Sequence, residues 1–196
     1  PVDVGFSNRG ADRKQPRFRV ASMTAMHSDG WRGEVTIYRS STNTRPIQMT
    51  SDLSWVALMD ALAPAAGPIR AEDKHRLPFF TPGLLRADVP LIGKTLERAR
   101  ERGEPEIGAM RSAGHMTSAT FVIFEFDGLT LAQFAAVGAA VLGKGRAGLM
   151  YTTHSHGRKD KQGIRVRLVI PVNVRLDANA YRIAHEAMND VLFEGL

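Results

Sequence analysis

Residues 120–128 read TFVIFEFDG and form the strongest structural signal in the chain. The stretch is rich in aromatic and β-branched side chains, which predicts a buried central β-strand. Successive side chains of a strand point to opposite faces of the sheet. One face therefore receives three apolar side chains: Val122, Phe124 and Phe126. The other face receives two apolar side chains followed by two acids: Phe121, Ile123, Glu125 and Asp127.

The two acids share one face of this strand, with Cα atoms about 6.5–7 Å apart. Carboxylates at this spacing can hold one or two Mg²⁺ or Mn²⁺ ions, which prefer oxygen ligands and often share them with substrate phosphates. The alternative is that Glu125 and Asp127 are two solvated acids where the strand meets the turn at Gly128. The residues alone leave both interpretations open.

The elements that follow this strand suggest a compact α+β unit. A helix is expected over 129–142, and buried strands over 148–153 and 164–172. Asp177 is a good N-cap for a last helix, whose expected apolar stripe is Tyr181, Ala184, Met188, Val191 and Leu192. The order β-α-β-β-α is most of a ferredoxin-like or RNA-recognition-like unit.

Residues 150–172, MYTTHSHGRKDKQGIRVRLVIPV, gather polar and basic side chains between two expected strands. His154 and His156 share a face of an extended chain, and the hydroxyls of Thr153 and Ser155 alternate with them. The next strand carries Arg165 and Arg167 on one face. Its other face is apolar, with Ile164, Val166, Leu168 and Ile170. The loop between the strands adds three cations: Arg158, Lys159 and Lys161.

This basic cluster could bind a triphosphate, because arginine offers forked donors, lysine a point charge and histidine a switchable donor. Other interpretations remain for each part. The His-x-His pair could ligate a metal, or one histidine could be structural. The basic loop could be a solvated hairpin tip, and the two arginines could cover an exposed sheet face.

The N-terminal half is less regular. We expect residues 1–17 to form a flexible arm. Residues 18–26 and 33–41 are strand-like, and the turn residues between them suggest a hairpin. A helix with Trp55, Leu58, Met59 and Leu62 on one face follows, for which Thr50 or Ser51 is the expected cap.

Two further segments complete the chain. The proline-rich segment 64–92 is expected to be irregular, and long irregular segments in compact domains are often functional. Residues 94–102 predict a short helix. Its arginines, Arg98, Arg100 and Arg102, are expected to form a solvated face rather than a nucleic-acid stripe.

Composition excludes several classes of protein. The chain has 196 residues, no cysteine, and 26 Lys+Arg against 20 Asp+Glu, a net charge of +6. The lack of cysteine removes disulfides, thiolate metal sites and cysteine nucleophiles. No apolar run approaches the roughly 18 residues of a membrane span. We expect a cytoplasmic domain with no membrane association, and the basic excess suits a polyanionic partner. Because the chain opens on Pro1, we expect a fragment or processed product.

The motifs VIFEFDG (122–128) and YTTHSHGRKDKQGIRVRLVIPV (151–172), followed by an AY-containing helix, resemble the archaeo-eukaryotic primase superfamily. The likeness is greatest to primase-polymerase domains of replication proteins from bacterial plasmids, phages and integrated elements. Upstream, SWVALMDAL (54–62) and DKHRLPFFTPGLL (73–85) resemble segments that precede the first acidic motif in that group. The resemblance covers about residues 35–196. It implies a primase-polymerase palm with an N-terminal α/β portion, spanning 18–196 of a longer replication protein.

The resemblance also implies roles for individual residues. Glu125 and Asp127 match the motif that holds the catalytic metal ions. His156, or alternatively His154, matches the histidine that contacts the nucleotide phosphates. Ser155, Arg165 and Arg167 stand where the family has nucleotide-contacting groups, and Arg158 and Lys159 are added from the basic loop.

Two positions depart from the family pattern. The first motif begins with Glu125 rather than the commoner aspartate. The family's third acid follows the last helix, where this chain ends. Asp177, Asp160 or Asp190 could substitute for it, or it could lie beyond the chain end.

The activity implied is template-directed nucleotidyl transfer on a single-stranded DNA template, with NTP or dNTP substrates, Mg²⁺ or Mn²⁺, and a helicase domain or protein as a possible partner. Two other classes stay open. A rolling-circle initiator or relaxase-type nuclease would use His154 and His156 on a metal and Tyr181 as nucleophile. A catalytically degenerate module would bind nucleic acid without turnover.

Overall fold

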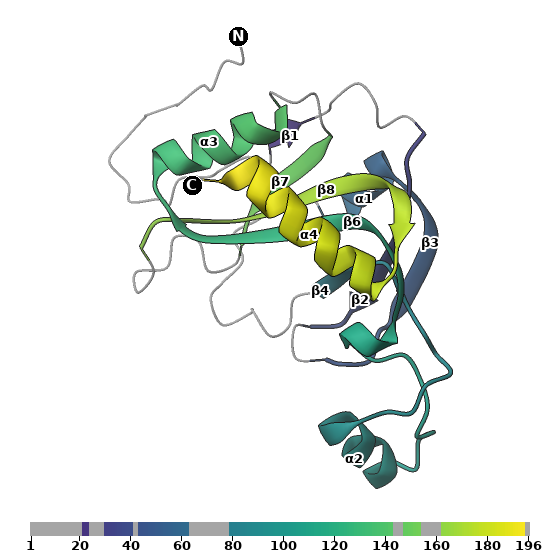
Figure 1. Ribbon diagram of the computed structural model, residues 1–196. Helices are drawn as coiled ribbons and strands as arrows, with labels where there is room; N and C mark the ends of the chain where they lie inside the picture. Colours follow the sequence, from purple (N-terminus) through teal and green to yellow (C-terminus); the bar gives the residue numbers. More distant parts are fainter. Residues whose placement is uncertain are drawn as a thin grey trace.

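The computed structural model in Figure 1 describes residues 21–23, 30–40, 43–62, 79–142, 147–153 and 162–194. Within these ranges the protein is mixed α+β, with two antiparallel sheets and four α-helices. The expected arm, residues 1–17, lies outside the described residues. None of the helices in these ranges has the length and apolar character needed to cross a membrane.

The larger sheet has the strand order β1-β7-β8-β6-β5. Its central elements follow the expected order β-α-β-β-α, as β6, α3, β7, β8 and α4. Strand β8 lies between β6 and β7 and runs antiparallel to both. The bounds of the elements of this half are β1 (Ala21–Met23), β5 (Leu84–Leu85), β6 (Met116–Leu129), α3 (Leu131–Leu142), β7 (Gly148–Thr152), β8 (Ile164–Leu176) and α4 (Ala178–Phe193).

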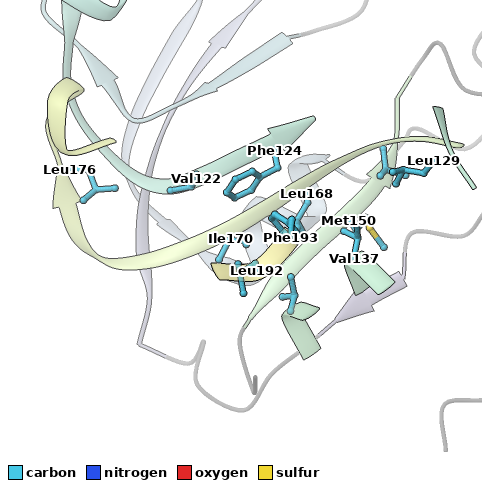
Figure 2. Packing of buried hydrophobic residues seen from close by; sticks show 12 residues of the cluster. Val122, Phe124, Leu129, Val137, Met150, Leu168, Ile170, Leu176, Leu192 and Phe193 are labelled. Carbon is cyan, nitrogen blue, oxygen red and sulfur yellow. The ribbon is translucent and has the colours of Figure 1, made fainter. Parts of the chain in front are cut away.

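Helices α3 and α4 cover one face of this sheet, as Figures 1 and 2 show. The core beneath them takes alternate residues from β6 and β8: Val122, Phe124, Val166, Leu168 and Ile170. The predicted alternation of both strands is therefore confirmed. The expected cap is confirmed too, because the Asp177 carboxylate accepts a hydrogen bond from the Ala180 N–H at 2.8 Å.

The stripe of α4 differs from the prediction at one position. Tyr181, Ala184, Met188 and Leu192 pack on the core as expected. Val191, however, is 70% exposed, and Phe193 is buried instead. Phe193 makes edge-to-face contacts with Phe124 and Phe126, which a smaller side chain at that end of the helix could not reach.

The second face of the large sheet packs against a smaller sheet of order β3-β2-β4, together with α1. These elements are β2 (Arg32–Tyr38), β3 (Gln48–Ser54), α1 (Trp55–Leu62) and β4 (Phe79–Pro82). Trp31 and Trp55 meet edge to face with centroids 5.4 Å apart, and Trp31 also contacts Phe121 of β6. The Trp31 indole N–H donates to the carbonyls of Thr120 and Val172. The smaller sheet is thus anchored directly onto β6 and β8.

Two predictions for the N-terminal half are wrong. The strands at 18–26 and 33–41 do not form a hairpin, because β1 pairs with β7 while β2 pairs with β3 and β4. The helix is capped by Ser54, whose hydroxyl accepts a hydrogen bond from the Ala57 N–H, and not by Thr50 or Ser51. Both of those residues belong to β3.

The proline-rich segment contains more structure than expected. Its described part, 79–92, includes β4 and β5, joined at Gly83, where φ is +77°. Beyond it the chain forms α2 (Gly93–Glu101), the expected charged helix, which Figure 1 shows projecting away from the two sheets. Arg98, Arg100 and Arg102 are exposed, and Arg100 forms a forked ion pair with Glu106. The three arginines therefore lie on an exposed face of the helix, as predicted, and the choice of a solvated face over a nucleic-acid stripe stays a prediction.

A buried glutamate joins the two sheets. Glu34 of β2 is 2% exposed, and its carboxylate accepts a hydrogen bond from the Ser118 hydroxyl of β6. The same carboxylate lies 3.0 Å from Nε of Arg175. Arg175 reaches it because β8 has three extra residues between its pairings at Pro171 and Leu176, which bows the strand outward.

Candidate active site on the open sheet face

The two predicted acids lie opposite the two predicted arginines. Glu125 of β6 is paired in register with Arg167 of β8, and Arg167 Nη2 donates to the Glu125 carboxylate. One step further along the strands, Arg165 Nη1 lies 2.8 Å from Asp127 Oδ1. The structure therefore brings together the two predicted metal-binding acids and the two predicted phosphate-binding arginines.

The four residues lie on this sheet face directly next to its apolar part. The preceding row across the sheet, Ile123, Val169 and Leu149, packs against the smaller sheet. The next row contains Glu125, Arg167 and Tyr151, again in register. The site thus lies at the edge of the interface between the two sheets, where solvent first reaches the larger sheet.

The two acids of the site are more exposed to solvent than its two arginines. The side chains of Glu125 and Asp127 are 61% and 64% exposed, whereas those of Arg165 and Arg167 are each 18% exposed. The carboxylates can therefore change partners at little cost in desolvation. The guanidinium groups are held largely inside the protein, and a charge held there needs a counter-charge.

Tyr151 is the third member of the central row and was not predicted as a site residue. Burial raises the pKa of its phenol, and the neighbouring Arg167 offsets part of the rise. Burial alone would lower the pKa of Arg167, but Tyr151 and Glu125 raise it above the ordinary value. Arg167 is therefore always charged, and the phenol is neutral at physiological pH.

The smaller sheet adds an aromatic ring, and the loop between α2 and β6 adds a further cation. The Arg167 guanidinium carbon lies 5.6 Å from the centroid of Phe79, the first residue of β4. Arg111 lies over the same ring at 4.8 Å and over Tyr38 at 5.6 Å. Phe79 belongs to the proline-rich segment 64–92, and segments of this kind are often functional. Arg111 carries no comparable signal, because nothing local to residue 111 indicates that its side chain lies over Phe79 of β4.

Two glycines shape the end of the β6–β8 ladder beside the site. Gly128 and Gly163 have φ values of +82° and +75°. A Cβ atom on Gly163 would lie 2.5 Å from the carbonyl carbon of Gly128. The ladder is irregular between Phe126 and Leu129. The close approach of these two backbones lets Asp127 and Arg165 meet past that irregularity.

Several predicted residues lie outside the described ranges: His154, Ser155, His156, Arg158, Lys159, Asp160 and Lys161. The described residue just before them, Thr153, donates its N–H to the Arg165 carbonyl at 3.0 Å. The chain therefore leaves β7 beside the arginine pair.

The structure does not bring the described substitutes for a third acid to the pair. Asp177 caps α4 and follows Leu176, which pairs with Ala119. That pairing is six residues along β6 from Glu125, or about 20 Å. Asp190 is an exposed residue of α4, the helix that covers the opposite face. Asp177 thus has a structural task, and neither residue is near Asp127.

Tyr181 also belongs to the opposite face. It packs partly buried against the core under α4, and its hydroxyl accepts a hydrogen bond from the Ile123 N–H at 3.2 Å. Burial raises the pKa of this phenol. These contacts match a core tyrosine and give no support to its use as a nucleophile next to residues 154–156.

The donor set of the site fits a hard divalent cation that brings part of its own coordination. No cluster of three or more His, Asp or Glu side chains suited to a metal occurs within the described ranges. Mg²⁺ is commonly bound through one or two protein carboxylates, with waters and substrate phosphates completing its shell. Glu125 and Asp127 supply those two carboxylates, and the adjacent arginines supply donors for phosphate.

Comparison of the chain with protein-family models, curated proteins and solved structures finds no match.

Proposed function

We propose that this domain catalyses metal-dependent, template-directed nucleotidyl transfer of the primase-polymerase type, on a palm formed by the β-α-β-β-α unit. The observation that carries the proposal is the pairing of Glu125 with Arg167 and of Asp127 with Arg165 on an otherwise apolar sheet face. Solvent-accessible ion pairs of this kind contribute little to the stability of the fold. The four side chains are well suited to exchange partners when a substrate brings both a cation and an anion.

The proposed substrate is a nucleoside triphosphate carrying Mg²⁺ or Mn²⁺, which brings cations and phosphates together. On binding, the two carboxylates would hold the cations, and the arginines that they release would bind the phosphate oxygens. Each charge has a counter-charge both before and after the exchange. The half-exposed acids supply the mobility, and the largely buried arginines supply the fixed positions.

In this proposal Glu125 and Asp127 hold the metal ions, while Arg165 and Arg167 bind and orient the phosphates. Ions bound there would increase the acidity of a primer 3′-OH and neutralise charge on the leaving pyrophosphate. His156 or His154, Ser155, Arg158 and Lys159 are proposed to complete the phosphate site from the adjacent segment. The single-stranded DNA template is bound by the surplus of basic side chains.

The test compares the purified wild type with the double variant Glu125→Gln/Asp127→Asn in primer extension with dNTPs, NTPs and Mn²⁺ or Mg²⁺. The amides keep the shape of the acids but bind metal poorly, so incorporation should fall at least 100-fold. Glu186→Gln is the matched control, because Glu186 is an exposed acid paired with Arg182 on α4. It should retain full incorporation.

Each other result has a definite meaning. Incorporation by the double variant at the wild-type rate would refute the site assignment. A wild type that binds Mg²⁺–nucleotide but never extends a primer would favour the degenerate binding module. Site-specific nicking with a 5′-phosphotyrosine product, lost in Tyr181→Phe, would establish the relaxase-type nuclease instead.

A further inference from the structure

Arg167 has a support that does not depend on its carboxylate partner. Its guanidinium lies between the Glu125 carboxylate, the Tyr151 side chain and the ring of Phe79. Tyr151 is in register with Arg167 on the neighbouring strand β7, so the two side chains leave the same face of the sheet side by side. Among these three neighbours, only Glu125 is substantially exposed.

We propose that Tyr151 is a positioning residue, which holds Arg167 in place for an anionic phosphate group when Glu125 turns to a cation. This inference rests on the proposed function, since it assigns a role within the same site. It gives a role to the first residue of the motif at 151–172, to which neither the resemblance nor the charge pattern assigns one.

The physical reason is the cost of a buried guanidinium that loses its counter-charge. Arg167 is 18% exposed, so it cannot simply return to water when Glu125 leaves it. The Tyr151 hydroxyl and Arg167 Nε are both buried, and neither has a hydrogen-bond partner among the described residues. An unsatisfied buried donor is unfavourable by about 1–3 kcal/mol. The pair can satisfy each other while the outer nitrogens of Arg167 face the incoming anion.

The surroundings of Tyr151 make it a rigid support. Its ring lies 6.4 Å from Phe80 of β4, at the margin of the core between the two sheets. Among the residues that the structure describes, the charged groups that act on it are Arg167 and Glu125, both in its own row. Because the phenol of Tyr151 packs against Phe80 of the smaller sheet, it can hold Arg167 in place and leave the outer nitrogens of Arg167 free to bind the phosphate.

The experiment is a double-mutant cycle on ligand binding. Wild type, Tyr151→Phe, Arg167→Gln and the combined variant are titrated calorimetrically with inorganic triphosphate and with a Mg²⁺–nucleotide. Tyr151→Phe removes only the hydroxyl and should weaken both ligands about tenfold, or 1.4 kcal/mol. In the Arg167→Gln background the same change should have almost no effect, because the group that it positions is gone. Steady-state incorporation should show a raised KM with kcat within about twofold of wild type.

Tyr181→Phe is the matched control, because Tyr181 is also a half-buried tyrosine and its hydroxyl serves the backbone of Ile123. It should lower the melting temperature slightly and leave both affinities unchanged. An equal loss in both Arg167 backgrounds, or no loss at all in Tyr151→Phe, would overturn the inference while leaving the proposed function standing. A wild type that binds no triphosphate would overturn both.

Discussion

Replacing Gly163 with alanine tests whether the close approach of β6 and β8 is needed at the site. Two costs can be worked out from the structure. The first is conformational, because φ is +75° at this residue and such a conformation costs an L-residue about 1–2 kcal/mol. The second is steric, because the new Cβ would lie 2.5–2.7 Å from three backbone atoms of Gly128. Backbone atoms cannot rotate away, so the strands must part, at about 1–3 kcal/mol.

The sum predicts that Gly163→Ala lowers the free energy of unfolding by about 2–5 kcal/mol. Gly103→Ala isolates the conformational part, since φ at Gly103 is +63° and nothing lies within 4 Å of its Cβ position. That control should lose only about 1–2 kcal/mol. Guanidinium chloride unfolding, with both variants and the wild type fitted to a common slope, gives the difference.

The same strand separation acts on the site. Gly163 is two residues from Arg165, and Gly128 directly follows Asp127, so parting the backbones should draw this pair apart. Gly163→Ala should therefore also weaken triphosphate binding, and Gly103→Ala should not. Equal stability losses in the two glycine variants, within about 0.5 kcal/mol, would refute the steric reasoning.

Two further predictions concern structural acids. Glu34→Ala removes the buried carboxylate that Ser118 and Arg175 contact. Arg175 is 71% exposed and can be hydrated instead, so the loss is that of the acceptor for the Ser118 hydroxyl, and the free energy of unfolding should fall by about 1–3 kcal/mol in urea titration; no loss at all would mean that Ser118 does not depend on Glu34. Asp177→Ala removes the cap of α4 and should lower stability by about 1 kcal/mol in the same assay. Nucleotide incorporation should be unchanged in Asp177→Ala, and its loss in a stable variant would make Asp177 the missing third acid.

The sequence predicted the parts of the fold that depend on local pattern. The period-2 alternation of β6 assigned Phe124 to the helix-covered face and Glu125 to the open face, and both assignments are confirmed. Asp177 was identified as a cap because capping needs only the residue itself and the helix after it. Each face of this strand packs against a different neighbour. The alternation can therefore be recognised from the sequence of that strand alone.

The errors arose where the answer depends on distant partners. Residues 18–41 contain two strand-like stretches and turn residues, which is the local signature of a hairpin. The actual partner of β1 is β7, more than one hundred residues away in sequence, and no local pattern encodes that choice. Thr50 and Ser51 were expected to precede a helix, whereas the polar run they belong to pairs with β2.

The site was predictable to the extent that its residues lie on alternating strands. Glu125, Asp127, Arg165 and Arg167 were assigned to faces from sequence, and their mutual contact then follows from strand order. Phe79 of β4 and Arg111, from the loop between α2 and β6, lie beside the same place. Their contribution depends on how the two sheets pack, which the sequence pattern alone does not express.

The two hydrophobic cores on either side of β6 and β8 have a consequence for how accurately these strands must pair. A slip of one residue along either strand would exchange its two faces. The carboxylates or the guanidinium groups would then lie beneath α3 and α4, and aromatic rings would face the solvent. Both cores disfavour the same slip in register. Hydrophobic packing, rather than the ion pairs themselves, therefore fixes where the charged pairs lie.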